Sequence, residues 1–194
     1  MKLVFATHNQ HKYEEVVPLM PDFIELVNLK TICCFDEIPE TGSTLEENAR
    51  IKADYVTENY GLPCFSDDTG LLVDALNGAP GVYSARYAGE EKNANANMDK
   101  LLLALKGQSS RKARFETVIV LNLPTTSKVF RGQVAGEITH EKSGTLGFGY
   151  DPIFKPLGYN KTFAEIPLAD KNTMSHRGRA MKQLLAFLNT LAAS

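Results

Sequence analysis

A short apolar segment near the middle of the chain leads directly into two adjacent aspartates. Residues 62–65 predict a buried strand, and residues 66–71 then read Ser-Asp-Asp-Thr-Gly-Leu. We expect the acidic pair to end this strand and Gly70 to turn the chain. Successive strand side chains point to opposite faces, so Asp67 and Asp68 cannot face the same site. Taken alone, such a pair is better explained by an exposed turn with two solvated acids, but carboxylates beside an apolar run are costly unless paired, hydrogen-bonded or bound to metal.

The composition is that of an ordinary globular protein. The chain has 194 residues, 43% of them hydrophobic and 23% charged, enough for one large domain or one domain with two lobes. The formal net charge of −2 argues against a nucleic-acid polymer as partner. No run approaches the ~18 apolar residues of a membrane helix, and residues 1–7 do not resemble a secretory signal. We therefore expect a cytoplasmic protein that binds no membrane.

The cysteines support the same compartment. Cys33, Cys34 and Cys64 have no zinc-site spacing, and the first two are too close for an ordinary disulfide. We expect all three to be buried free thiols in a reducing environment.

The N-terminal segment predicts a strand, a polar loop and a helix. Residues 2–6 form a nearly continuous apolar run, as in a central strand covered on both faces. Apolar side chains then recur at helical spacing, at Tyr13, Val16, Val17 and Met20. Asn9 is suited to cap this helix, and Lys12 lies in its first turn. The arrangement can cradle a phosphate, although a simple cap and a surface lysine account for the same residues.

A second strand is expected over residues 23–29, and a helix with an apolar stripe over residues 45–60. Thr44 and Glu47 fit a capping box, which explains Glu47 structurally. Glu40 precedes a Thr-Gly turn and has no such explanation. Asn48 and Lys52 lie four residues apart and share a helix face, so Lys52 is either solvated or directed at a bound anion.

The second half of the chain completes a mixed sheet. Residues 93–105 predict a helix, and residues 115–122 and 128–140 predict an antiparallel ribbon. The apolar spacing after residue 180 predicts a last helix, capped by Ser175 or Thr173.

Two further polar passages are candidates for binding. Residues 144–152 interleave glycines with two aromatics and an acid, which lets backbone and rings approach a flat ligand, although a hairpin loop with buried aromatics explains them equally well. Residues 169–179 place Lys171, His176 and Arg177 around the start of the last helix. Positive charge there opposes the helix dipole, so an anionic or strongly accepting partner is expected.

Taken in order, these passages resemble the inosine/xanthosine triphosphate pyrophosphatases, or Ham1-like family. The matching pieces are residues 6–12, 40–42, 47–49, 52–53, 66–71, 78–87, 147–152 and 171–178, in a match that runs from residue 3 to about residue 188. The resemblance implies a single two-lobed α/β domain over residues 1–194, with a long mixed sheet flanked by helices and a central cleft. It implies a cytoplasmic homodimer that hydrolyses the non-canonical purine nucleoside triphosphates XTP, ITP and dITP to monophosphate and pyrophosphate, with Mg²⁺ as cofactor.

The resemblance also implies roles for individual residues. Glu40 and Asp68 match the magnesium-binding carboxylates, Asp68 is also the proton acceptor, and Thr69 contacts substrate. The triphosphate is assigned to Thr7, His8, Asn9, Gln10, His11, Lys12 and Lys52. The base pocket is assigned to Phe148, Gly149, Tyr150, Asp151, Lys171, His176 and Arg177. The chain departs from the family pattern at His8, where glycine or serine is common, and at Thr69, where serine is frequent.

The residue types suit this chemistry. Carboxylate oxygens are the ligands that Mg²⁺ prefers, and an aspartate can act as general base on a water. His176 and Arg177 can donate hydrogen bonds to the carbonyl at position six of hypoxanthine or xanthine, whereas the amino group of adenine would leave these donors unpaired.

Three alternatives compete with this interpretation: a Maf-type house-cleaning pyrophosphatase, a non-catalytic nucleotide sensor, and a structural α/β domain. Residues 175–177 together with the Phe148 loop argue against the first. The presence of both carboxylates argues against the second, and the number of polar passages against the third.

Overall fold

The computed structural model describes residues 1–192, which divide into two compact units. The first unit contains Met1–Asp68, Thr117–Gly132 and the chain from Arg179 onward, and the second contains Thr69–Glu116 and Gln133–Gly178. Within the described residues, no helix combines the length and the apolar character that crossing a membrane requires.

The strands of residues 1–192 form a mixed sheet in the order β2-β1-β3-β5-β6-β7, with β4 beside β3. β1 pairs in parallel with β2 and β3, whereas β4 and β7 are antiparallel to β3 and β6. The strands are β1 Lys2–Phe5, β2 Glu25–Asn28, β3 Cys64–Val73, β4 Pro80–Gly81, β5 Lys112–Leu123, β6 Thr126–Ile138 and β7 Phe154–Pro156. The helices are α1 Gln10–Val16, α2 Leu45–Tyr60, α3 Ala94–Ala104, α4 Leu168–Met174 and α5 His176–Ala192.

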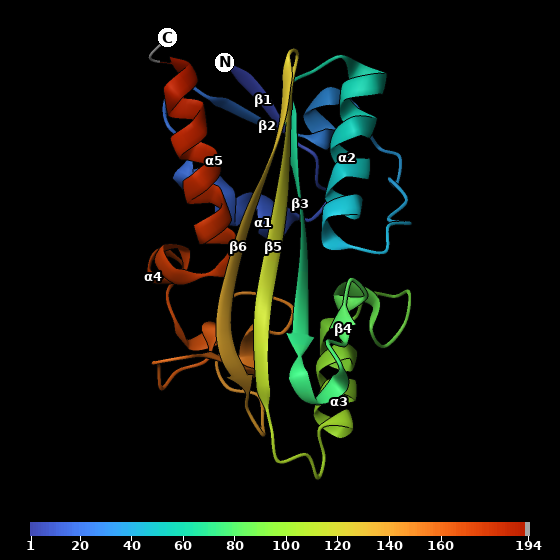
Figure 1. Ribbon diagram of the computed structural model, residues 1–194, viewed down its shortest axis with the longest axis vertical. Helices are drawn as coiled ribbons and strands as arrows, with labels where there is room; N and C mark the ends of the chain where they lie inside the picture. Colours follow the sequence, from blue (N-terminus) through green and yellow to red (C-terminus); the bar gives the residue numbers. More distant parts are fainter. Residues whose placement is uncertain (193–194) are drawn as a thin grey trace. The chain divides into compact units, whose positions relative to one another are not determined.

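Helices cover both faces of the sheet in the first unit. Figure 1 shows α2 on one side of β1 and β3, and α1 with α5 on the other. Leu3 and Phe5 pack in the core under α1 and α5, whereas Val4 packs in the core under α2. This burial on both faces confirms the central strand that the apolar run of residues 2–6 predicts.

The second unit has its own core. The end of β3 contributes Leu71 and Val73, and α3 contributes Met98 and Leu101. Aromatic residues complete this core: Phe115 lies edge-on to Phe154, with ring centroids 4.7 Å apart.

Several local predictions are confirmed. The side chain of Asn9 caps α1, and Thr44 and Glu47 form a complete capping box at α2. Asn93 also caps α3 through the backbone N–H of Ala96, a cap that was not predicted from the sequence. These motifs depend on residues three apart, so sequence alone specifies them.

The prediction that the acidic pair ends its strand is wrong. β3 continues through Asp68 and Gly70 to Val73. Leu71 and Val73 are fully buried in the core of the second unit, and Leu71 pairs with Gly81 of β4. Continuing the strand therefore buries apolar side chains that a turn would expose.

Three other expectations need correction. The segment before the last helix forms α4, so Thr173 lies inside a helix, and Ser175 accepts the hydrogen bond from the Gly178 N–H at the start of α5. Helix α1 ends at Val16, before Pro18, which leaves Val17 exposed. Cys33 is exposed, because it caps a short 3-10 turn in the left-handed conformation at the surface, whereas the other two thiols are buried.

Candidate active site

The adjacent aspartates of β3 point to opposite faces of the sheet, as the strand geometry predicts. Asp67 lies on the α1 face, where it accepts a hydrogen bond from the Lys12 ammonium at 2.8 Å. Asp68 lies on the α2 face, where its Oδ2 accepts from Asn48 Nδ2 at 3.2 Å and its Oδ1 is 3.7 Å from Lys52 Nζ. Both aspartates are buried, so each carboxylate has a polar partner that offsets part of its desolvation.

Helix α2 carries two buried polar side chains toward Asp68. Asn48 bridges two segments, because its Oδ1 accepts from the Gly42 N–H at 2.7 Å while its Nδ2 donates to Asp68. A Cβ on Gly42 would lie 2.7 Å from that Asn48 oxygen, so the contact requires glycine. Lys52 donates to Glu40 Oε1 at 2.6 Å. The ammonium of Lys52 therefore contacts both carboxylates that the sequence assigns to metal binding.

The charges on the α2 face perturb one another. Burial lowers the pKa of Lys52, but Asp68, Glu40 and Asp67 outweigh this and hold its pKa above the ordinary value. Burial raises the pKa of Asp68, and Lys52 and Lys12 only partly oppose it. Burial is thus the main cause of the raised Asp68 pKa, whereas the neighbouring carboxylates cause the raised Lys52 pKa. Lys52 therefore stays charged, and Asp68 is a stronger base than an exposed carboxylate.

The carboxylates of this cluster suit a magnesium ion. Glu40 and Asp68 surround one ammonium and leave an excess of negative charge. Within residues 1–192, no group of three or more His, Cys, Asp or Glu side chains is placed to hold a metal. Mg²⁺ is commonly bound by one or two carboxylates, with water and substrate phosphates as further ligands. The two carboxylates fit that pattern.

The loop of residues 7–12 is held by its own hydrogen bonds. Asn9 Oδ1 accepts from the Lys12 N–H at 3.2 Å, and the Asn9 N–H donates to Thr7 Oγ1 at 3.1 Å. His8 Nε2 donates to the Asp36 carbonyl at 2.9 Å. Gln10 and His11 instead lie on the exposed side of α1, near Glu14.

A second cluster lies within the second unit, around a buried ion pair. Lys171 Nζ is 2.6 Å from Asp151 Oδ2, and both side chains are only 4% exposed. The same oxygen accepts from the Phe148 N–H at 2.8 Å. The ring of Phe148 has Lys171 Nζ 5.4 Å and Arg177 Cζ 5.7 Å from its centroid. Arg177 Nη2 donates to Thr69 Oγ1 at 3.2 Å.

The structure brings most of the predicted base-pocket residues together and places others apart. Thr69, Phe148, Asp151, Lys171 and Arg177 are linked by the contacts above. Gly149 follows in the same loop in a left-handed conformation, with φ of 64°. His176 stacks on Phe115, with centroids 4.5 Å apart and planes inclined by 16°.

Tyr150 belongs to the core of the second unit. Its hydroxyl donates to the Ser84 carbonyl at 2.8 Å, and burial raises its pKa. Sequence reasoning assigned no site role to Asn48 or Asp67. The four-residue spacing of Asn48 from Lys52 and the alternation along β3 are the features that indicate them.

The fold and the clusters define an α/β protein in which two carboxylate–lysine pairs lie on opposite faces of one strand. A family model described as the Ham1 family matches residues 3–187, and the chain belongs to this family. This confirms the resemblance inferred from the order of the polar passages.

Relatives and solved structures agree with this assignment. A protein of Flavobacterium johnsoniae named dITP/XTP pyrophosphatase is 58% identical, covering 97% of this chain and 98% of that protein. A protein of the same name from Christiangramia forsetii is 57% identical, covering 97% and 100%. The Ham1 protein structure from Staphylococcus aureus covers 98% of this chain and 99% of its own, with 41% identity and a TM-score of 0.89. A HAM1 protein structure from Coxiella burnetii, with the same coverage, has 39% identity and a TM-score of 0.90.

Proposed function

We propose that this chain hydrolyses the non-canonical purine nucleoside triphosphates XTP, ITP and dITP to the nucleoside monophosphate and pyrophosphate. The observation that carries the proposal is the buried carboxylate of Asp68, held by Asn48 and Lys52 with Glu40 beside the same ammonium. The names of relatives that are 58% and 57% identical support the same substrate class.

Asp68 is the proposed general base. It takes a proton from a water as the water oxygen bonds to the α-phosphorus and the bond from that phosphorus to the bridging oxygen breaks. Pyrophosphate leaves with the electron pair of that bond. The raised pKa of Asp68 favours this role, because a base is more effective when its pKa approaches the working pH, and such catalysis contributes ~10²–10⁴-fold.

Glu40 and Asp68 are the proposed magnesium ligands. A magnesium ion bound there supplies positive charge to the phosphate oxygens. The chain itself adds the ammonium groups of Lys12 and Lys52, which Asp67 and Glu40 hold in place. Because these carboxylates orient the lysines, little reorganisation is needed when phosphates bind.

The cluster of the second unit is the proposed base site. Phe148 offers a ring for stacking, and Arg177 and Lys171 are the donors nearest that ring. A carbonyl at position six can accept from such donors, whereas the amino group of adenine would leave them unpaired. Buried mismatches of this kind discriminate by ~10⁴-fold or more.

Pyrophosphate release from XTP, dITP, GTP and ATP, with Mg²⁺ and with chelator, tests this function. We expect rapid magnesium-dependent release from XTP and dITP and slow release from GTP and ATP. Release of single phosphates would move the attack away from the α-phosphorus and overturn the role of Asp68. Tight binding without turnover would make the chain a nucleotide sensor.

The magnesium site has a separate test. Glu40→Gln removes one proposed ligand charge while Lys52 keeps its contact with Asp68. Glu58→Gln, on the exposed side of α2, is the control. We expect calorimetry to show roughly tenfold weaker Mg²⁺ binding in Glu40→Gln only. Unchanged Mg²⁺ binding would remove Glu40 from the site.

The family resemblance extends the proposal to a homodimer in the cytoplasm. Light scattering coupled to size-exclusion chromatography measures the first property, and fractionation of the source cells the second. A monomer at all working concentrations would contradict the homodimer. Enrichment outside the cytoplasmic fraction would contradict the location.

A further inference from the structure

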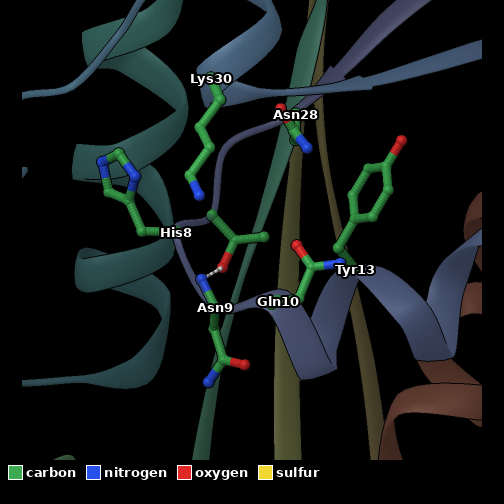
Figure 2. Close-up of a pocket in the computed structure, with 7 residues that line it drawn as sticks. His8, Asn9, Gln10, Tyr13, Asn28 and Lys30 are labelled. Atoms are coloured by element: carbon green, nitrogen blue, oxygen red, sulfur yellow. Dashed lines mark hydrogen bonds between the residues drawn. The ribbon is translucent and has the colours of Figure 1, made fainter.

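The first unit has an open pocket where the loop of residues 7–10 meets the end of β2 (Figure 2). Tyr13, Asn28 and Lys30 complete its lining, and none of these described lining residues is acidic. We infer that this pocket binds the terminal phosphate of the triphosphate chain, with Lys30 and Asn28 as its specificity-determining residues. The inference deepens the proposed function and rests on it for the identity of the substrate.

Asn28 presents a donor of fixed orientation. Its Oδ1 accepts from the Thr31 N–H at 3.0 Å and from the Thr31 hydroxyl at 3.1 Å. Because these two bonds fix which end of the amide is oxygen, the Nδ2 group is turned away from Thr31, and Figure 2 shows it on the pocket side. The amide therefore offers N–H donors to the pocket.

Lys30 supplies the charge. Its side chain extends from the end of β2 toward the loop that carries His8 and Asn9, as Figure 2 shows. Within residues 1–192, no carboxylate is paired with this ammonium. Lys12 and Lys52, by contrast, each contact a carboxylate. The positive charge of Lys30 is thus available to a bound anion.

The other polar side chains of the pocket are directed elsewhere. The Tyr13 hydroxyl donates to the Leu26 carbonyl at 3.1 Å, and Gln10 Nε2 donates to Glu14 at 3.0 Å. His8 donates from Nε2 to the Asp36 carbonyl at 2.9 Å. Lys30 and Asn28 are therefore the residues that select the phosphate group, and the Thr7 hydroxyl is a further donor.

The terminal phosphate is the ligand that matches this chemistry. Such a group carries up to two negative charges and several acceptor oxygens, and it needs donors and a cation without a neighbouring acid. The pocket shares residues 7–9 with the loop proposed to hold the triphosphate. The terminal phosphate of a triphosphate bound to that loop can therefore enter the pocket. A nucleoside diphosphate lacks this group, whereas free pyrophosphate retains it.

The variant Lys30→Gln tests the site. Its control is Lys182→Gln, which removes the same charge from an exposed position on α5. We expect Lys30→Gln to raise the KM for ITP and the inhibition constant of pyrophosphate by about five- to tenfold, with no more than about a twofold change for IDP as a competitive inhibitor. Lys182→Gln leaves all three values unchanged. Equal weakening of ITP and IDP, or no change in either, would overturn the inference.

Asn28→Asp provides an independent test. An aspartate preserves the acceptor for Thr31, and with it the local turn, but replaces the donor group with a negatively charged oxygen. We expect an unchanged melting temperature and at least tenfold weaker pyrophosphate binding by calorimetry. Unchanged binding in this folded variant would exclude Asn28 from the site.

Calorimetry with pyrophosphate separates this inference from the proposed function. If the wild type hydrolyses neither XTP nor ITP but binds pyrophosphate, and Lys30→Gln loses that binding, the phosphate site is supported and the hydrolase function is refuted. If the protein hydrolyses XTP and Lys30→Gln binds pyrophosphate as the wild type does, the phosphate site is refuted and the hydrolase function is supported.

Discussion

The ammonium of Lys52 on α2 lies 2.6 Å from the carboxylate of Glu40, which stands in the loop before that helix. Lys52 is nearly buried and also lies 3.7 Å from Asp68. One lysine therefore orients the two carboxylates on which the proposed chemistry depends. Because the neighbouring acids keep its pKa raised, this arrangement persists over the pH range in which the carboxylates are ionised.

Asp68→Asn is expected to separate activity from stability. The variant keeps an oxygen for Asn48 but loses the base, so kcat should fall at least ~10²–10⁴-fold. Pyrophosphate release and circular dichroism measure the two effects. A folded variant with a near-normal rate would contradict the assignment of Asp68 as base.

The pH dependence of stability provides a second measurement on the same variant. Since burial raises the pKa of Asp68, the native state holds this proton to higher pH than the unfolded chain. Ionisation of Asp68 therefore lowers the free energy of unfolding as pH rises from the ordinary carboxyl value through the raised one. Asparagine removes this penalty. We expect the melting temperature of Asp68→Asn at about pH 8 to equal or exceed that of the wild type, and a clearly lower value would disagree.

Thr69→Val tests how Arg177 is positioned. The substitution keeps a β-branched side chain in β3 but removes the hydroxyl that accepts from Arg177. A hydrogen bond to a charged group contributes ~1.5–3 kcal/mol, so we expect the KM for XTP to rise about tenfold or more and kcat to change less. Thr69→Ser should restore the KM. If serine failed to restore the KM, the hydroxyl alone would not account for the effect.

Lys171→Met should destabilise the second unit strongly. It leaves the carboxylate of Asp151 buried without its ammonium, and breaking a buried pair in this way costs about 3–5 kcal/mol. Urea unfolding measures the loss. Asp151→Asn combined with Lys171→Met should recover part of it, because no unpaired charge remains.

The matched control for this prediction is Lys155→Met. Lys155 pairs with Glu137 at the same distance of 2.6 Å, but both side chains are substantially exposed. We expect a loss below about 1 kcal/mol, because exposed pairs contribute little. Equal losses in the two single variants would show that burial does not control the effect.

Alkylation should distinguish the three thiols. Cys33 is exposed, whereas Cys34 and Cys64 are buried. Burial raises the pKa of Cys64 to about 11, and its thiol donates to the Ala53 carbonyl. Because the thiolate is the reactive form, iodoacetamide at about pH 8 should modify native protein at Cys33 only. Cys33→Ser should then take up no label, and labelling of Cys64 by mass spectrometry would refute the prediction.

The sequence by itself determined the features that depend on neighbours along the chain. Asn9, Thr44 and Ser175 cap helices because the N–H groups that donate to them lie within three residues. The burial of β1 follows from its continuous apolar run, and the buried face of α2 follows from the spacing of its apolar residues. The ordered polar passages were enough to identify the family, since together they cover nearly the whole chain.

Only the tertiary structure decided which polar groups meet. Lys12 and Asp67 are 55 residues apart, and Lys171 and Asp151 are 20 apart, distances at which no local pattern selects a partner. The continuation of β3 past Asp68 likewise depends on the burial of Leu71 and Val73 in a core built from distant elements. Caps and periodicity act within a few residues, whereas side-chain pairing and the extent of a strand depend on the burial that the assembled core provides.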